Sequence, residues 1–197
     1  FPKKGMYLNV YHEISTAKLG TGISFTKTFI SYEFFVTARN TNTFHPKIIF
    51  GYGDNTLPYT EQYKLGGQNS FFGLRDNEFR GRQIFVTSLE YRWLLPFKLF
   101  FDTYISLRYD IGSVWEKTEA IKLENLRHGI GLSFALDTPV GPSIFSLGNS
   151  FISNRSLPNN PFLFGPVFFY FSLGYTLDWY VLENYSSDAQ SQITIII

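Results

Sequence analysis

The sequence predicts an all-β fold, an antiparallel sheet that spans a membrane as a β-barrel. Aromatic residues make up 19% of the 197 residues and charged residues only 17%, whereas an average soluble domain has about 25% charged residues. No apolar run approaches the roughly 20 residues of a membrane-spanning helix. Instead, polar and apolar residues alternate along eight segments, as expected for strands with one face toward lipid.

The remaining composition excludes several classes of protein. A net charge of +1 gives no electrostatic case for binding nucleic acid. The absence of cysteine excludes a disulfide scaffold and a thiolate zinc site. The chain begins at Phe1 with no signal peptide in view, so we expect either a cleaved leader or a piece of a longer protein.

Three strands are predicted in the first part of the chain, at Met6–Ile14, Thr26–Ala38 and Pro46–Asp54. The second shows the clearest alternation. One face carries Thr28, Ile30, Tyr32, Phe34 and Val36, and the other Lys27, Ser31, Glu33 and Thr37.

Residues 55–82 form a connection longer than the roughly 12–15 residues beyond which loops are usually functional or disordered. The segment is Gly-rich and charged, but it also carries several aromatic residues and leucines. That apolar content predicts a loop that is folded into a cavity.

Two longer strands follow the loop, at Gln83–Leu95 and Leu99–Val114. In the first, Ser88, Glu90 and Arg92 share one face. In the second, the polar face is made of Asp102, Tyr104, Ser106, Arg108, Asp110 and Gly112.

Three further strands complete the prediction, at Gly129–Asp137, Ser143–Ile152 and Val167–Trp179. The charged stretch 116–127 is expected to be a loop or a single helical turn. Residues 181–197 are expected to be a C-terminal extension outside the barrel domain 1–180, and their β-prone end, 192–197, has the composition of an adhesive strand.

Alternation alone does not distinguish a membrane barrel from a soluble β-sandwich or a lipocalin-like binder, which would bury the same face. Three features favour the membrane. The strands are roughly 9–16 residues long, against a usual 5–6 or so. Aromatic residues such as Trp93, Trp115 and Trp179 gather at strand ends. Short turns alternate with long loops, as in outer-membrane barrels.

The stretch from Gly66 to Trp115 resembles the carboxy-terminal barrel of the BamA/TamA superfamily, also called the bacterial surface antigen domain. Three motifs carry the resemblance: G-G-Q-N-S-F-F-G-L at 66–74, S-L-E-Y-R at 88–92 and D-I-G-S-V-W at 110–115. The family pattern is G-G-x-x-S-[VF]-R-G-[FY], then S-L-E-[YF]-R, then D-x-G-x-[VA]-W. F-P-K-K-G at 1–5 and T-P-V-G-P at 138–142 also match family turns.

The resemblance implies the second half of a sixteen-stranded barrel in the bacterial outer membrane, with eight strands present here. It also implies that loop 55–82 lies in the lumen, held by charge pairs to the barrel wall. The residues it assigns to the loop and its wall partners are Gly66, Gly67, Ser70, Phe72, Gly73, Arg75, Glu90, Arg92, Arg108, Asp110 and Gly112.

One position departs from the family pattern. Phe72 stands where the family has a loop arginine, which is thought to pair with acidic residues equivalent to Glu90 and Asp110. A buried carboxylate without a partner is costly. We therefore expect another arginine to take over, either Arg75, Arg80 or Arg82 from the loop, or the lumen-facing Arg92 or Arg108.

Other chemistry is weakly supported. Glu90 and Asp110 fit a salt-bridge network better than a catalytic carboxylate pair. His12, His45 and His128 lie on separate elements without metal-ligand spacing. The G-x-S-x-G nucleophile elbow of a patatin-type lipase is absent, and Gly66-Gly67 lacks the context of a phosphate loop. No enzyme activity, cofactor or metal is expected of this chain.

The resemblance implies a role in outer-membrane protein assembly or translocation, or as a membrane anchor. The partners would be outer-membrane lipid and unfolded outer-membrane or secreted polypeptide. The alternative is the barrel anchor of a patatin-type phospholipase with its catalytic domain upstream, because F-F-G-L-R-D-N-E-F-R-G-R-Q at 71–83 looks most like barrels fused to such enzymes.

Overall fold

Long antiparallel strands follow the eight predicted segments, and each has 11 to 14 residues. The computed structural model describes residues 1–16, 22, 24–117, 121, 126–153, 162–174 and 191–196. A tilted strand needs about 9–11 residues to cross a bilayer, so these strands are long enough. They are β1 (Gly5–Ser15), β2 (Phe25–Ala38), β3 (Asn42–Gly53), β6 (Gln83–Leu94), β7 (Thr103–Trp115), β8 (Arg127–Thr138), β9 (Gly141–Ser153) and β10 (Phe162–Leu173).

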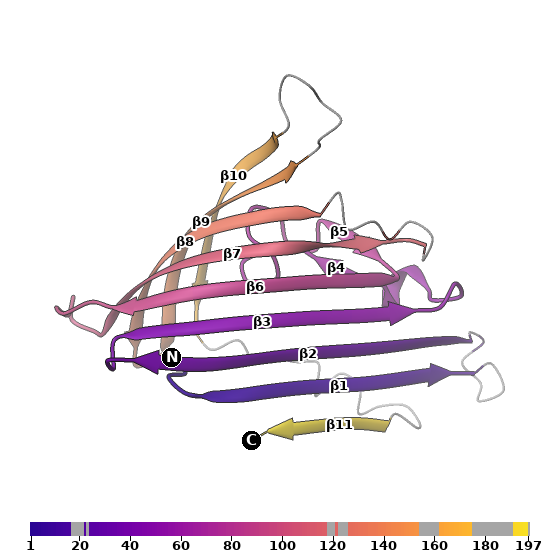
Figure 1. The fold of residues 1–197 in the computed structure, drawn as a ribbon, viewed down its shortest axis with the longest axis horizontal. Helices are drawn as coiled ribbons and strands as arrows, with labels where there is room; N and C mark the ends of the chain where they lie inside the picture. The colour runs from indigo at the N-terminus through magenta and orange to yellow at the C-terminus, as the bar shows by residue number, and fades with distance from the viewer. Residues whose placement is uncertain are drawn as a thin grey trace.

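The strands form one curved sheet in the order β10-β9-β8-β7-β6-β3-β2-β1-β11 (Figure 1). From β1 to β10, each long strand pairs with the long strands next to it in the chain, while β4 (Tyr63–Leu65) and β5 (Phe79–Gly81) are inserted between β3 and β6. Those two short strands pair only with each other. The sheet is open in the described part of the chain, since β10 and β11 are its two edges.

The last strand, β11 (Ser191–Ile196), comes from the predicted extension and pairs antiparallel with β1. It adds a ninth strand to the eight that the sequence predicts. Its backbone satisfies the outer edge of β1, which would otherwise expose unpaired N–H and C=O groups.

Several strand boundaries differ from the predicted ones. β3 begins at Asn42, so Pro46 lies within the strand and pairs with Leu89. β7 begins at Thr103, later than the predicted Leu99, because Phe100 adopts a left-handed backbone with φ 66°. β10 begins earlier than predicted, at Phe162, and shifts register between Phe164 and Val167. Its predicted end, 175–179, and most of the predicted 116–127 loop lie outside the described residues.

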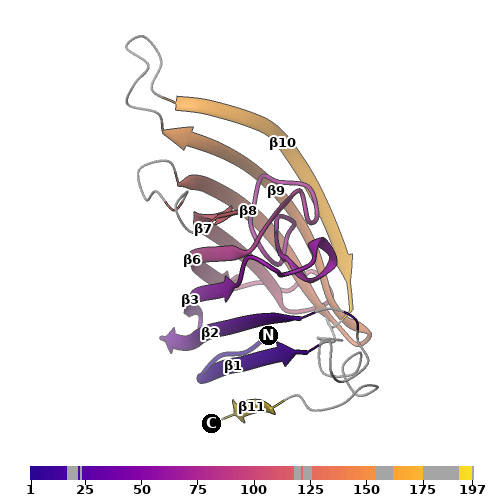
Figure 2. The same ribbon diagram turned by 90° about the vertical axis from the view of Figure 1, so that its right-hand side faces the viewer.

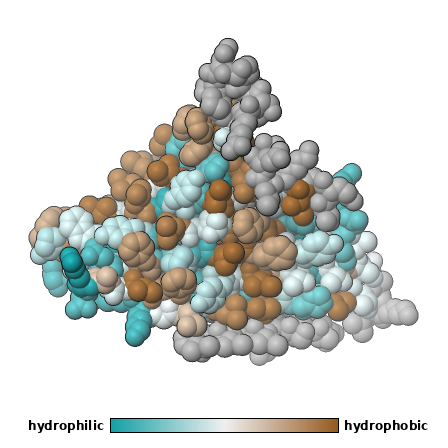
Figure 3. All heavy atoms as spheres, viewed as in Figure 1, coloured by the Kyte–Doolittle hydropathy of each residue, from teal (hydrophilic) through white to brown (hydrophobic). Residues whose placement is uncertain are grey.

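The predicted two-faced character of the strands is present. The convex face carries exposed apolar side chains from every long strand, for example Ile30, Leu89, Leu107 and Phe145. In Figure 3 brown side chains spread over the middle of this face, while teal ones gather toward the strand ends. An apolar band flanked by polar ends is the lipid-facing surface of an outer-membrane barrel. No helix in the described part of the chain is long and apolar enough to span a membrane.

The concave face is small and polar, and loop 55–82 lies against it (Figure 2). The loop contains a short 3-10 helix, η2 (Tyr59–Glu61), besides β4 and β5. Its apolar side chains pack on inward-facing residues of β6 and form the buried core: Tyr63, Leu65, Phe71, Leu74, Ile84 and Val86. The expectation of a folded loop is met by this burial.

Candidate functional site

The tip of loop 55–82 is joined to the concave face through Asp110, the most buried charged side chain of β7 at 0% exposure. One carboxylate oxygen accepts the backbone N–H of Phe72 at 2.8 Å. The other accepts the Nε–H of Arg108 at 2.7 Å. Residues 108 and 110 lie on the same face of the strand because side chains alternate, so the wall supplies both charges of this pair.

Arg108 also binds the loop directly. Its Nη1 donates to the carbonyl of Gln68 and its Nη2 to that of Ser70, both at 2.8 Å. The planar guanidinium can reach the carboxylate and two carbonyls at once because its donors form a rigid fork. Arg108 therefore supplies the positive charge that the sequence pattern leaves open when Phe72 replaces an arginine.

Phe72 is buried and lies against a glycine patch on β8 and β9, formed by Gly129, Gly131 and Gly148. A Cβ atom at Gly131 would lie 2.5 Å from the Phe72 ring, and one at Gly148 would lie 2.7 Å from it. The guanidinium carbon of Arg108, which extends from β7, lies 5.0 Å from the centroid of the Phe72 ring. The ring thus occupies a space that exists only because the wall has no side chains there.

Hydroxyl groups on β9 and β10 bind the loop immediately after Phe72. The Tyr170 hydroxyl accepts the N–H of Gly73 at 2.9 Å and donates to the carbonyl of Leu74 at 2.7 Å. The Ser150 hydroxyl donates to the carbonyl of Gly73 at 2.7 Å. The loop backbone is therefore bound from β7 and β10, which lie on either side of the glycine patch, and from β9, which is part of it.

The predicted loop glycines are required by geometry at two points. Gly67 has φ 97°, and a Cβ there would lie 1.9 Å from the Asp76 carboxylate. Gly73 has φ 76°, and its Cβ would lie 2.0 Å from the backbone of Asn149. Both positions combine a left-handed conformation with close approach, which only glycine tolerates.

The remaining predicted site residues are placed as follows. Gly66 and Ser70 lie in the turn that precedes Phe72, where the Ser70 N–H donates to the Gly67 carbonyl at 3.1 Å. Gly112 lies where a Cβ would meet the Phe85 carbonyl on β6 at 2.3 Å. Its role in the structure is therefore close strand packing.

Glu90 and Arg92 belong to a second polar cluster on β2, β3 and β6, in which Glu90 lies opposite Arg108 in the register of β6 and β7. The Glu90 carboxylate accepts from Arg92 Nη2 at 3.1 Å and lies 3.1 Å from His45 Nδ1. The other ring nitrogen of His45 lies 2.6 Å from Glu33. The contacts described for Glu90 come from the wall, so the structure does not bring Glu90 to the loop as the resemblance implies.

The three loop arginines do not approach Asp110. Arg80 lies over the Tyr59 ring at 4.9 Å, and Arg75 lies 6.0 Å from the Phe168 ring. Arg82 lies 3.7 Å from Glu116. Of the candidates that the sequence offers, Arg108 is the one that pairs with Asp110.

The base of the loop is held by Tyr63. Its hydroxyl donates to the carbonyl of Thr28 on β2 at 2.6 Å. Burial raises the pKa of Tyr63 above its ordinary value, because removal from water disfavours the phenolate. The hydroxyl thus stays protonated and remains a donor.

Glu90 and Asp110 bind different partners, so they do not form a shared carboxylate site. In the described ranges, no group of His, Asp and Glu side chains has the arrangement of a metal site. His12 contacts Thr28 and His128 contacts Tyr109, whereas His45 lies on the other face between its two glutamates. The site offers directed hydrogen bonds that hold one backbone segment in one position.

Sequence reasoning missed Gln68, Ser146, Ser150, Tyr170 and the glycine patch as parts of the site. Gln68 donates to the Ser146 hydroxyl at 2.9 Å. One signal was available, because Gly131 and Gly148 are inward-facing and paired across β8 and β9. Two facing glycines in strand interiors indicate that another group approaches the sheet there.

Comparison with known proteins agrees with this architecture. The family model described as the Omp85 superfamily domain matches residues 1–177, which include all eight long strands and loop 55–82. A search of curated proteins finds no match.

Proposed function

Because this chain belongs to the Omp85 superfamily of bacterial outer-membrane β-barrels, we propose that it acts in the assembly or translocation of polypeptides at that membrane. Its substrates would be unfolded outer-membrane or secreted polypeptides, and outer-membrane lipid would surround its convex face. The Omp85 domain defines a non-catalytic family, so we expect it to act by binding and positioning polypeptide.

The observation that carries the proposal is the attachment of residues 66–74 to the concave face. The loop is held by the buried Asp110 and Arg108 and by Tyr170, while the face around it is small and polar. A loop held in this way fixes the shape of the interior and limits passage through it. Its release would open a path along a polar wall.

The closing of the sheet belongs to the same proposal. Lipid does not tolerate an open sheet edge, since each unpaired backbone group costs several kcal/mol. We infer that β10 pairs with a further strand and that the sheet forms half of a larger barrel, for which a sixteen-stranded closure is the family expectation.

The test uses the complete gene product that contains this chain, reconstituted into liposomes with an unfolded small outer-membrane β-barrel protein. We expect the substrate to fold faster than in protein-free liposomes, as measured by its heat-modifiable gel mobility. We also expect depletion in cells to lower the amounts of outer-membrane proteins. Unchanged folding rates together with unchanged amounts in depleted cells would refute the proposal.

A second candidate is the membrane anchor of a patatin-type phospholipase, favoured by Phe72 and the sequence that follows it in the loop. In that case the gene product would release fatty acids from phospholipid vesicles. Substitution of the serine of an upstream G-x-S-x-G motif would abolish the release without altering barrel insertion. Fatty-acid release without accelerated folding of the substrate protein would select this candidate.

A further inference from the structure

The turn between β6 and β7, residues 95–102, is unusually apolar for a strand connection. Its sequence is L-P-F-K-L-F-F-D, and Phe97, Leu99, Phe100 and Phe101 are all exposed. Phe100 is 97% exposed, the highest value among the exposed large hydrophobic side chains of the described chain. Turns are normally built from Gly, Pro, Asn, Asp and Ser, so this composition requires a separate explanation.

The backbone conformation at Phe100 is a second unusual feature of this turn. Phe100 has φ 66°, a left-handed conformation that costs an ordinary residue roughly 1–2 kcal/mol. In the β2–β3 turn at the same end of the sheet, the two left-handed positions are Arg39 with φ 54° and Asn40 with φ 59°, and both side chains are polar. An aromatic residue thus occupies a position that is unfavourable both for its backbone and for its exposure to water.

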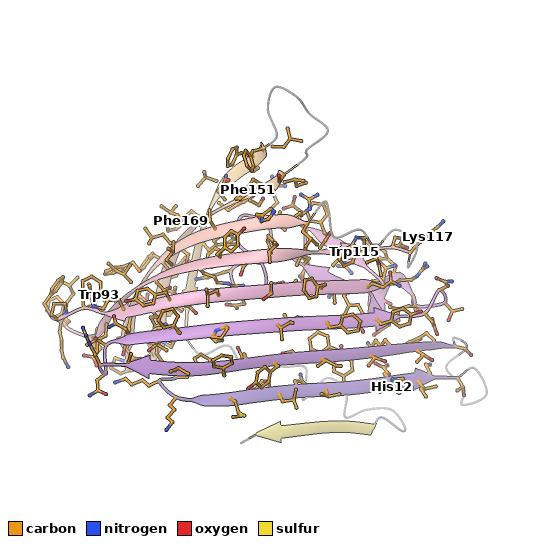
Figure 4. The ribbon with its side chains drawn as sticks, viewed as in Figure 1. His12, Trp93, Trp115, Lys117, Phe151 and Phe169 are labelled. Atoms are coloured by element: carbon orange, nitrogen blue, oxygen red, sulfur yellow. The ribbon has the colours of Figure 1, made fainter. Side chains whose placement is uncertain are left out.

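The turn is continuous with the lipid-facing surface. It follows Trp93, which is exposed on the convex face at the end of β6 and lies at the end of the sheet opposite Trp115 (Figure 4). In Figure 1 the β6–β7 connection extends beyond the ends of the neighbouring strands, and in Figure 3 brown atoms continue to that tip. The apolar band therefore does not end at Trp93.

The charges near the turn suit a phospholipid surface. Lys98 and Asp102 form an ion pair at 2.8 Å, and this pairing lowers the pKa of Asp102, so the turn itself adds no net charge. Lys3, Lys4 and Arg39 are exposed at the same end of the sheet. Aromatic side chains beside basic residues form the pattern of segments that lie in the membrane interface.

We propose that residues 95–102 are an interfacial anchor, with Phe97 and Phe100 inserted among the headgroups and upper acyl chains of the membrane. The short-turn end of an outer-membrane barrel faces the periplasm, so the lipid would be the phospholipid of the inner leaflet. The anchor fixes the depth and tilt of the β6–β7 pair, which carries Asp110 and Arg108. The inference depends on the outer-membrane location of the chain and not on its proposed role in assembly.

These 197 residues contain no cysteine, so a single cysteine introduced among them is the only labelling site in this part of the protein, and its depth can be measured. Single variants Phe100→Cys, Asn40→Cys and Leu107→Cys are spin-labelled in the complete protein in phosphatidylethanolamine and phosphatidylglycerol vesicles. Power saturation then compares collisions of each label with oxygen, which partitions into lipid, and with a water-soluble nickel complex. Leu107 is the lipid-facing control, and Asn40 is the matched control because it has the same backbone conformation in a polar turn.

We expect the oxygen-to-nickel ratio at position 100 to approach that at 107 and to exceed that at 40 several-fold. A ratio at 100 equal to that at 40 would show a turn in water and overturn the proposal. Low collision rates with both reagents would show that protein covers the turn, which would also overturn it. Each variant must first show the heat-modifiable mobility of a folded barrel.

Discussion

The carboxylate of Asp110 on β7 accepts the backbone N–H of Phe72 at 2.8 Å, while its second oxygen binds Arg108 of the same strand. Strand β7 thus holds the loop through the backbone N–H of Phe72 and not through its side chain. The side chain at position 72 is free to serve another purpose, which is packing on the glycine patch.

Removal of this carboxylate should release the loop. Asp110→Ala leaves the Arg108 guanidinium without its counter-ion and the Phe72 N–H without an acceptor, and the loss of one member of a buried pair costs about 3–5 kcal/mol. We expect residues 55–82 to become accessible to protease in the folded barrel. Asp102→Ala is the control, since Asp102 lies in the exposed β6–β7 turn. Unchanged cleavage of the Asp110 variant would refute the idea that the charge pair holds the loop.

Restoration of the family arginine should be harmful in this chain. Phe72→Arg places a second guanidinium near Arg108, whose own charge lies 5.0 Å from the ring it replaces. It also removes an aromatic ring from the glycine patch. We expect lower resistance to denaturant in detergent and faster cleavage of the loop.

A second test removes the Arg108 charge that would compete with an arginine at position 72. The double variant Phe72→Arg with Arg108→Ser leaves one arginine for Asp110, so it should be more stable than the sum of the two single changes predicts. A coupling of more than about 1 kcal/mol is expected for groups in contact. Strict additivity would show that the two positions act independently.

The glycine patch should be intolerant of even one methyl group. Gly131→Ala places a Cβ 2.5 Å from the Phe72 ring, and overpacking of this kind costs roughly 1–3 kcal/mol. We expect a lower denaturation midpoint in detergent. In a Phe72→Ala background the same substitution should cost almost nothing, because the ring that causes the clash is gone. An equal cost in both backgrounds would mean that the strand itself requires glycine.

Tyr170→Phe tests the hydroxyl that links β10 to the loop. The variant keeps the ring but loses the bonds to Gly73 and Leu74. The Leu74 carbonyl still accepts the Gly67 N–H, so the Gly73 N–H is the group left unsatisfied, at a cost of roughly 1–3 kcal/mol. We expect faster hydrogen exchange at Gly73 and greater exposure of residues 66–77. Tyr109→Phe is the matched control, since its hydroxyl contacts His128 on the convex face. Equal effects of the two variants would exclude a specific role for Tyr170.

The sheet could be predicted from the sequence because the period of two in the alternation is written directly in the chain. The inward-facing side of β2, β6 and β7 could be identified from the sequence, because Glu33, Glu90 and Asp110 mark the polar side of each alternating strand. The start of β7 could not be predicted, since the left-handed backbone at Phe100 interrupts a pattern that appears continuous. The start of β10 was missed for a similar reason, as its register shift hides the alternation.

The site was less accessible to prediction than the sheet. Asp110 and the loop glycines were identified, but Glu90 was expected at the loop and instead binds His45 and Arg92. Tyr170 lies 97 residues from Gly73 in the chain, and no local pattern records such a contact.

The sequence by itself determined an antiparallel membrane sheet, its two faces and a long folded loop, because these depend on local alternation and composition. The tertiary structure alone decided which groups hold the loop. The curvature of the sheet brings β7, β9 and β10 around residues 66–74, so Arg108 lies where it can bind Asp110, Gln68 and Ser70 together. A charge pair that depends on the distance between strands and loop becomes visible only once the sheet is folded.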